Sequence, residues 1–530
     1  MNIQIKQIKG DIVELLFDPE ESDLCVGENL SIMEKGGQKG IIIQVIELRT
    51  VTYPALVSEM LSLAVEGHGS LPPGLFEFYR RELSETSNLK VAIAKIRKSV
   101  QNPGSEAQGQ LDLGLETSDL RHWDQWDGWI PTRSVTMERI SGEEVFANCL
   151  NSIAGHPVHL GKTLAEEDFA IEGQDLEKVN IITGVKGVGK SHLAKVILLQ
   201  LIRNGAPCII FDINREYIHL PTHEVNLLTG KVISKGIVHL EAGVNFKLGI
   251  RQFGLAPLMI MLAKYGLPEV SAMHFESRLA RLLREMVEWE SMDRKPPFVG
   301  LEQLIQMAEQ GEFSDADVVN AAIRSRLIAL KGTKIFAARP EEAASLRDSY
   351  REIRDGGALV IDVSGLSNAA RSGLVQAIIE MIKEICDEEI ESGCERFPFT
   401  FFEEAHLYVS RASIDYIVTR ARHLGMSSFF VTNMIGGLDE AVLRQADNLF
   451  LLYLPFEDDV RHVSKSAITD YETLSSFVKR LRKYHALIIG RATSFYPLIV
   501  QVDHLEGVNT AGETRFFFKP ATADKRPVEV

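Results

Sequence analysis

The stretch VNIITGVKGVGKSHLAKVILLQLI, residues 179–202, decides the fold of this chain. It contains the pattern G-x-x-x-x-G-K-[ST] at residues 184–191, directly after a short apolar run and directly before an amphipathic one. In this context the glycines let backbone N–H groups curl around nucleotide phosphates, and the next helix points its N-terminus at them. The sequence therefore predicts a strand, a phosphate-binding loop and a helix, in that order.

The polar side chains of this loop have predicted roles. Lys190 is expected to offset charge on the β- and γ-phosphate oxygens, and Ser191 to ligate Mg²⁺. The strand and helix patterns on either side argue against the alternative, a glycine-rich turn without a ligand. We therefore expect ATP and Mg²⁺ as cofactors. The residues expected to bind the nucleotide are Gly184, Val185, Lys186, Gly187, Val188, Gly189, Lys190, Ser191 and His192.

A second apolar run, FTFFEEAH at residues 399–406, ends in two acids. Such a strand brings a Mg²⁺ ligand and a water-activating base to the edge of the sheet where the phosphate loop lies. Glu403 is expected to hold Mg²⁺, directly or through water, and Glu404 to act as the general base. The alternative is a strand that ends in solvated carboxylates. With Lys190, the pair predicts hydrolysis of the nucleotide.

Further polar residues follow other predicted strands. Asp212 ends PCIIFD, and Thr432 and Asn433 end SSFFVTN. At the carboxyl edge of a parallel sheet these side chains could meet the γ-phosphate, and Asn433 is a candidate sensor. Formation of a turn is the alternative for each. Asp362, in ALVIDV, is a weaker candidate, with capping of the next segment as its alternative.

Arg420 and Arg422 lie in TRARHLG, just before the SSFFVTN strand. If the protein forms a ring, one of them could reach the γ-phosphate of a neighbouring subunit and stabilise charge in the transition state, with Arg422 preferred. The alternative is a solvated surface position. The prediction of a catalytic arginine therefore depends on the prediction of a ring.

The pattern along the chain predicts an α/β fold. Its core is a P-loop NTPase (RecA-like) parallel sheet with a helical insertion, preceded by a small N-terminal β-barrel. The expected units are a β-rich barrel at 1–105, a linker and the first part of the ATPase core at 106–245, the helical insertion at 246–354, the second part of the core at 355–505 and a C-terminal segment at 506–530.

Composition excludes several classes of protein. The 530 residues are 45% hydrophobic and 25% charged, which is ordinary globular usage, and the longest apolar runs are too short to cross a membrane. The start of the chain does not resemble a signal peptide, so we expect a cytoplasmic protein. Five scattered cysteines predict reduced, mostly buried thiols. A net charge of -16 disfavours non-specific nucleic-acid binding, so any contact with nucleic acid must be local.

These motifs together resemble the HerA-like branch of the HerA/FtsK translocase superfamily. The likeness rests, in chain order, on HPVHLGKTLAEEDFAIEGQDLEKVNIITGVKGVGKS, IIFDINREY, ALVIDVSGL, FFEEAHLYV, TRARHLGMSSFFVTN and NLFLLYL. The long stretch between Lys190 and Glu403 fits that branch, in which a helical bundle is inserted there. The resemblance implies a homo-hexameric ring that uses ATP to move double-stranded DNA, an N-terminal HAS barrel, and a closing segment, here ETRFFFKP at 513–520, that packs on a neighbouring subunit.

The chain departs from the family pattern in two places. Where the family has Thr-Gln-Arg-Pro after the sensor strand, this chain has Thr-Asn-Met-Ile at residues 432–435. The sensor arm at Asn433 is therefore one methylene shorter, and we expect slower or differently gated hydrolysis. The family's Asp-Pro-x-Gly-Glu-Tyr appears as Asp212-Ile-Asn-Arg-Glu216-Tyr217, which keeps the acids and changes the turn.

Three functions compete. The first is a DNA translocase or helicase that works with a separate nuclease or sirtuin-like effector, in anti-phage defence or DNA-end processing, because the chain has no convincing nuclease constellation of its own. The second is an ATP-regulated hexameric scaffold that assembles and controls an effector enzyme, which Asn433 and the acidic net charge slightly favour. The third, a motor that pumps DNA across a membrane, is disfavoured because the sequence contains no predicted membrane segment.

Overall fold

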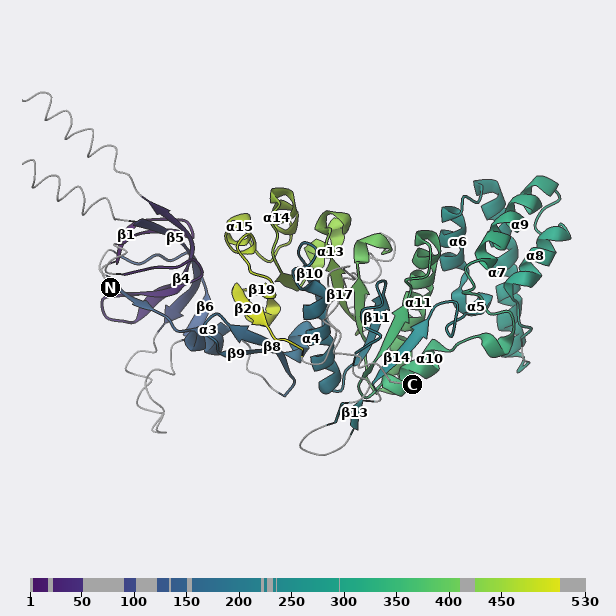
Figure 1. The fold of residues 1–530 in the computed structure, drawn as a ribbon, viewed down its shortest axis with the longest axis horizontal. Coiled ribbons are helices and arrows are strands. Elements are labelled where there is room, and N and C mark those ends of the chain that lie inside the picture. The colour runs from purple at the N-terminus through teal and green to yellow at the C-terminus, as the bar shows by residue number, and fades with distance from the viewer. Residues whose placement is uncertain are drawn as a thin grey trace, which may run out of the picture.

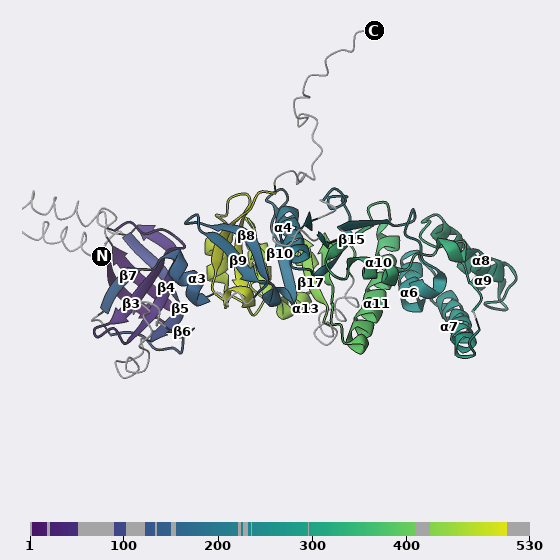
Figure 2. The same cartoon turned by 90° about the horizontal axis from the view of Figure 1, so that it is seen from below.

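The structure is a computed structural model, and it shows an elongated molecule with three parts in a row (Figure 1). A purple antiparallel sheet lies at one end, a large sheet flanked by helices in the middle and a group of helices at the other end, and the same order appears in Figure 2. The residues described are 3–17, 22–50, 90–101, 122–132, 135–149, 155–220, 224–225, 232–234, 236–294, 296–409 and 425–505.

The central sheet has 11 strands in the described residues, in the order β14-β15-β11-β16-β17-β10-β18-β19-β20-β8-β9. From β14 to β18 neighbouring strands are parallel, as predicted, whereas β19, β20, β8 and β9 add an antiparallel half that the sequence analysis did not anticipate. The strands are β8 (Pro157–Thr163), β9 (Asp168–Glu172), β10 (Val179–Thr183), β11 (Pro207–Asp212), β14 (Ile237–Glu241), β15 (Gly357–Asp362), β16 (Phe399–Glu403), β17 (Ser427–Thr432), β18 (Asn448–Leu451), β19 (His485–Gly490) and β20 (Leu498–Val502).

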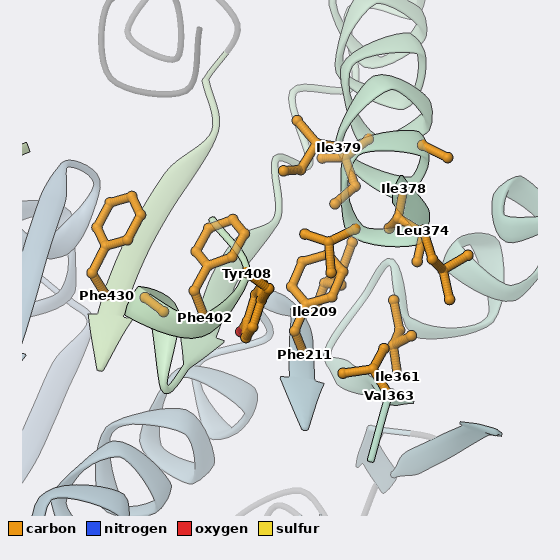
Figure 3. Close-up of a cluster of buried hydrophobic side chains, with 14 of the residues drawn as sticks. Ile209, Phe211, Ile361, Val363, Leu374, Ile378, Ile379, Phe402, Tyr408 and Phe430 are labelled. Atoms are coloured by element: carbon orange, nitrogen blue, oxygen red, sulfur yellow. The ribbon is translucent and has the colours of Figure 1, made fainter. Parts of the chain in front are cut away.

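Both faces of the parallel half are covered, because successive strand residues point to opposite sides. Helix α4 (Lys190–Arg203) packs on one face and α11 (Asn368–Ser392) on the other. Figure 3 shows Ile378 of α11 beside Ile209 and Phe211 of β11. A strand buried on both faces reads as a continuous apolar run, which is why these strands were recognisable in the sequence.

The helical insertion contains no strand among its described residues, as predicted, apart from two isolated bridges, Ala242 with Phe246 at its start and Leu248 with Phe336. One of its helices, α6, contacts α11 so closely that a Cβ on Gly373 would lie 2.8 Å from the Cβ of Met261. The insertion is therefore packed directly on the central sheet's helical layer. Its helices are α5 (Ile250–Phe253), α6 (Leu255–Lys264), α7 (Glu269–Ser291), α8 (Leu301–Glu309), α9 (Asp317–Lys331) and α10 (Leu346–Ile353).

The N-terminal sheet has the order β1-β2-β5-β4-β3-β7, with β6 paired to β5. No ladder joins β1 to β7 within the described residues, so this part is a half-barrel sheet there, which is consistent with the small β-barrel that was predicted. Strands β6 and β7 also extend it beyond residue 105; the five-unit division stays a prediction. The strands are β1 (Ile3–Lys9), β2 (Ile12–Phe17), β3 (Asn29–Glu34), β4 (Lys39–Thr50), β5 (Lys90–Gln101), β6 (His122–Gln125) and β7 (Val135–Arg139).

A buried lysine on the N-terminal sheet pairs with a carboxylate of the central part. Lys95 Nζ on β5 lies 3.1 Å from a carboxylate oxygen of Asp11 and 2.8 Å from one of Asp470. Asp470 caps α15 (Tyr471–Val478) by accepting the Thr473 N–H at 2.9 Å. Burial opposes ionisation of Asp470, but the bonds from Lys95 and Thr473 outweigh it and hold its pKa well below the usual range. The N-terminal sheet therefore contacts the central part through an ion pair in which Lys95 is buried and Asp470 is partly exposed.

Two sequence expectations concern the whole molecule. Among the helices in the described stretches, none combines the length and apolar character needed to cross a lipid bilayer. Four cysteines are free thiols: Cys208 and Cys386 are buried, but Cys25 and Cys394 are exposed, so the prediction of mostly buried thiols is only half right for these four.

Candidate active site

The loop between β10 and α4 has a conformation that depends on glycine. Gly189 has φ 114°, and a Cβ there would lie 2.7 Å from a ring carbon of Tyr484. Backbone bonds hold the loop at two points: the Val185 N–H donates to the Tyr453 carbonyl at 3.0 Å, and the Tyr484 N–H donates to the Val188 carbonyl at 3.0 Å. The loop is therefore shaped before any phosphate arrives, with the N-terminus of α4 behind it.

Lys190 is the first residue of α4, and its side chain is 7% exposed. Its Nζ donates to the Val185 carbonyl at 3.0 Å, back across the loop. Burial lowers the pKa of Lys190, and the negative charges of Glu404, Glu403 and Glu216 act in the opposite direction. A phosphate oxygen is a stronger acceptor for this partly desolvated ammonium than a neutral carbonyl is.

Glu403 ends β16 in the interior of the protein. Its Oε1 accepts the Ser191 hydroxyl at 2.7 Å and its Oε2 accepts the Tyr217 hydroxyl at 2.7 Å. Burial raises the Glu403 pKa to about 7, against the effect of these two hydrogen bonds. The structure thus brings together the two residues predicted to hold Mg²⁺. A carboxylate and a hydroxyl oxygen suit a hard divalent cation, so the residues present fit the ion.

Glu404, the predicted base, has left-handed backbone geometry with φ 49°. That conformation costs about 1–2 kcal/mol in a residue other than glycine and turns the side chain away from the direction of β16. Its Oε1 accepts the Asn433 amide at 3.1 Å. Its Oε2 is buried without a hydrogen-bond partner in the described residues and lies 3.5 Å from His406 Nδ1. The predicted base and the predicted sensor are thus in direct contact.

His406 joins this group, although the sequence analysis gave it no role. Its Nδ1 lies 2.9 Å from Thr432 Oγ1, which also accepts the Met434 N–H at 3.1 Å. Burial lowers the His406 pKa, against the effect of the nearby Glu404 carboxylate. His406 follows Glu404 by two residues, and this proximity in the sequence was the available signal.

Asp212 forms a turn, which was the alternative to its meeting the γ-phosphate. Its carboxylate accepts the N–H groups of Asn214, Glu216 and Tyr217 at 3.1, 3.2 and 2.9 Å. The turn delivers Tyr217 to Glu403, a contact that the sequence analysis missed. The sequence signalled only the turn, because an aspartate often binds backbone N–H groups a few residues on.

Asp362 also acts locally. It accepts the Ser364 N–H at 2.9 Å and Arg215 Nε at 2.7 Å, so it caps the segment after β15 and pairs with the turn after β11. This matches the alternative stated for it in the sequence analysis.

Three further predicted site residues are His192, Arg420 and Arg422. The His192 side chain has its Nε2 2.6 Å from the Asp503 carbonyl and its ring edge-on to Tyr484, with centroids 5.1 Å apart. It therefore packs on the segments around β19 and β20. Arg420 and Arg422 fall in 410–424, outside the described residues.

The chain is similar in sequence to a known protein family and to named proteins. Residues 158–382 match the family described as "Helicase HerA, central domain", a segment that contains the phosphate loop and ends before Glu403. A protein named DNA double-strand break repair helicase HerA, from Sulfolobus acidocaldarius, is 23% identical over 406 residues, which are 71% of this chain and 75% of that one. Its namesake from Sulfurisphaera tokodaii is 21% identical over 368 residues, 66% of this chain and 70% of that one.

A solved structure shares the fold. VirB4 of Thermoanaerobacter pseudethanolicus superposes with a TM-score of 0.50 and 14% identity, over 67% of this chain and 98% of that one. At this identity the likeness concerns the fold alone, and it agrees with a P-loop NTPase core.

Proposed function

The chain is a HerA/FtsK-type ATPase, and from this premise we propose that it forms a homo-hexameric ring that uses ATP and Mg²⁺ to move double-stranded DNA. The names of its relatives, which are DNA repair helicases, support the choice of DNA as the partner. We further propose a cytoplasmic protein that works with a separate nuclease or sirtuin-like effector, in anti-phage defence or DNA-end processing.

One observation carries the catalytic part of the proposal: Ser191 bonds to Glu403 at 2.7 Å, beside Glu404. Lys190 binds the β- and γ-phosphates, and Ser191 and Glu403 hold Mg²⁺. The ion supplies compensation for the charge that develops on the phosphates. Glu404 orients the attacking water and accepts its proton, and Asn433 keeps the Glu404 carboxylate in place.

The test measures ATP hydrolysis by the wild type and by Glu404→Ala, each with and without duplex DNA. We expect duplex DNA to stimulate the wild type, and Glu404→Ala to lose turnover while it still binds ATP. Hydrolysis that responds neither to DNA nor to the substitution contradicts the translocase.

The ring is tested through Arg422, which we propose reaches the nucleotide of a neighbouring subunit. Arg422→Ala is expected to bind ATP without turnover. Mixed with subunits that lack only Glu404, it should regain part of the activity, because some interfaces then combine an intact Arg422 with an intact Glu404. No recovery on mixing would place the arginine's action within its own subunit.

The scaffold with ATP as a regulatory ligand is the second candidate, and the contact between Asn433 and Glu404 supports it. An amide bound to the base at 3.1 Å could restrain it as well as position it. In that case the ring assembles on ATP and recruits its effector, and turnover stays slow with or without DNA. The rate of ATP hydrolysis with and without duplex DNA separates the two, because only the translocase needs hydrolysis for its action.

A further inference from the structure

Two buried tyrosines donate hydrogen bonds to the same glutamate. The Tyr217 hydroxyl donates to the Glu403 carboxylate, at Oε2, over 2.7 Å. The Tyr408 hydroxyl donates to the Glu403 backbone carbonyl over 2.8 Å. Figure 3 shows the Tyr408 ring between Phe402 and Phe211, in the apolar core under the site. Only the first of these bonds can influence where the carboxylate points.

Tyr217 is itself held from several sides. Its N–H donates to Asp212 at 2.9 Å, which fixes the backbone. The Lys195 ammonium lies 5.3 Å from the centre of its ring and 3.5 Å from a carboxylate oxygen of Glu216. Tyr217 and Lys195 are fully buried, and such a cation is attracted to the face of the ring. The phenol therefore reaches Glu403 from a fixed position.

We propose that Tyr217 is the positioning residue of the divalent-cation site. By binding Oε2 it fixes the Glu403 carboxylate so that Oε1 faces Ser191, and the two oxygens that hold the cation are oriented before it binds. Partners of this kind, one step removed from the metal, typically change metal affinity 10- to 100-fold when they are removed. The inference rests on the proposed function, in which Ser191 and Glu403 hold the ion.

The test is Tyr217→Phe, which removes the hydroxyl and keeps the ring. Mn²⁺ is titrated into the full-length protein with a bound non-hydrolysable ATP analogue, and free Mn²⁺ is followed by electron paramagnetic resonance. We expect the Mn²⁺ affinity to fall by about 10-fold or more. Binding of the same analogue in EDTA should stay within about twofold of wild type, because the phosphate contacts of the loop do not involve Tyr217.

Tyr408→Phe is the matched control. It removes a buried hydroxyl that bonds to the same residue over nearly the same distance, but at the backbone. Its Mn²⁺ affinity should change by less than about twofold, although its unfolding temperature should fall as much as that of Tyr217→Phe. Equal losses of Mn²⁺ affinity in the two variants, or no loss in either, would overturn the role proposed for Tyr217.

A second pair of variants tests whether Tyr217 acts through the Glu403 carboxylate. Glu403→Gln and Glu403→Gln/Tyr217→Phe lack the buried carboxylate, and the two should have the same Mn²⁺ affinity. A further loss in the double variant would show that Tyr217 acts elsewhere, against the proposal. The proposed function fails in a different way: a wild type in which Mn²⁺ neither binds with the analogue nor supports hydrolysis contradicts the cation site itself.

Discussion

Glu403 and Glu404 are consecutive, but their surroundings differ sharply. Glu403 is 2% exposed, and each of its carboxylate oxygens accepts a hydroxyl. The Glu404 side chain is 18% exposed. One of its carboxylate oxygens accepts a hydrogen bond from the Asn433 side-chain amide, and the other has no hydrogen bond in the described part of the chain. We call Ser191, Tyr217 and Glu403 the cation half of the site, and Glu404 and Asn433 the base half. The fold satisfies both carboxylate oxygens in the cation half, whereas one carboxylate oxygen in the base half has no hydrogen bond in the described residues.

The difference teaches where this ATPase can vary. The two residues that donate hydrogen bonds to the Glu403 carboxylate, Ser191 and Tyr217, come from separate segments of the chain. Around Glu404 the partner is Asn433, the position where the chain departs from the family's Gln. Nucleotide and cation binding should thus tolerate little change, and turnover should be adjustable.

The largest effect is expected from Lys190→Ala, which breaks both halves together. Loss of bonds to charged oxygens should weaken ATP binding about 10- to 100-fold and abolish measurable turnover. Lys186→Ala is the control, since it removes an exposed side chain of the same loop and keeps the backbone N–H group through which this residue is expected to bind phosphate. Calorimetry and a phosphate-release assay give the two readouts. Unchanged affinity and rate in Lys190→Ala would refute the assignment of the loop.

Glu404→Gln should break only the base half. The amide cannot accept a proton from water, so kcat should fall about 100- to 10,000-fold. ATP affinity should stay within about twofold, because Glu404 does not bind the phosphates in the proposed arrangement. A parallel loss of affinity would mean that the two halves are not separable.

For Asn433→Leu the direction of the change in kcat shows whether Asn433 positions Glu404 or restrains it. The side chain keeps its approximate volume and loses the amide that bonds to Glu404. If the amide positions the base, kcat should fall about 10-fold with KM unchanged, and Asn433→Gln, which restores the family's residue, should retain activity. A rise in kcat would instead identify Asn433 as a restraint and favour the scaffold.

The smallest effect is expected from Arg215→Ala. Arg215 pairs with Asp362 and Glu241 beside the site, but it is half-exposed and touches neither Glu403 nor Glu404 in the described structure. Turnover should stay within about twofold, and the unfolding temperature should change by less than about 2 °C. A loss of activity comparable to that of Asn433→Leu would mean that Arg215 also influences the base Glu404.

The parallel strands and the loop could be predicted because their signals are local. Doubly buried strands such as β11 and β16 are continuous apolar runs, and the phosphate loop is a contiguous motif. The antiparallel half was missed because its order, β18-β19-β20-β8-β9, depends on pairing between distant segments. Nothing near residue 163 indicates that it pairs with Val500.

Site prediction divided in the same way. The meeting of Ser191 with Glu403 followed from the rule that the carboxyl ends of parallel strands share one edge. The roles of Tyr217 and His406 could not be predicted, because they depend on how a turn and a short helix aim their side chains. Asp212 indicated that a turn forms, but not that this turn brings Tyr217 to Glu403.

The pairing of β20 with β8 also has a consequence for how the protein is made. Val500 lies opposite Thr163, so β8 pairs on one side with β9, which follows it in the chain, but on the other side only with a strand near the far end of the chain. Contacts this distant form late and slowly. On the ribosome the central sheet therefore stays incomplete until almost all of the chain has emerged, and residues 158–382 expressed alone should aggregate through their unpaired strand edges.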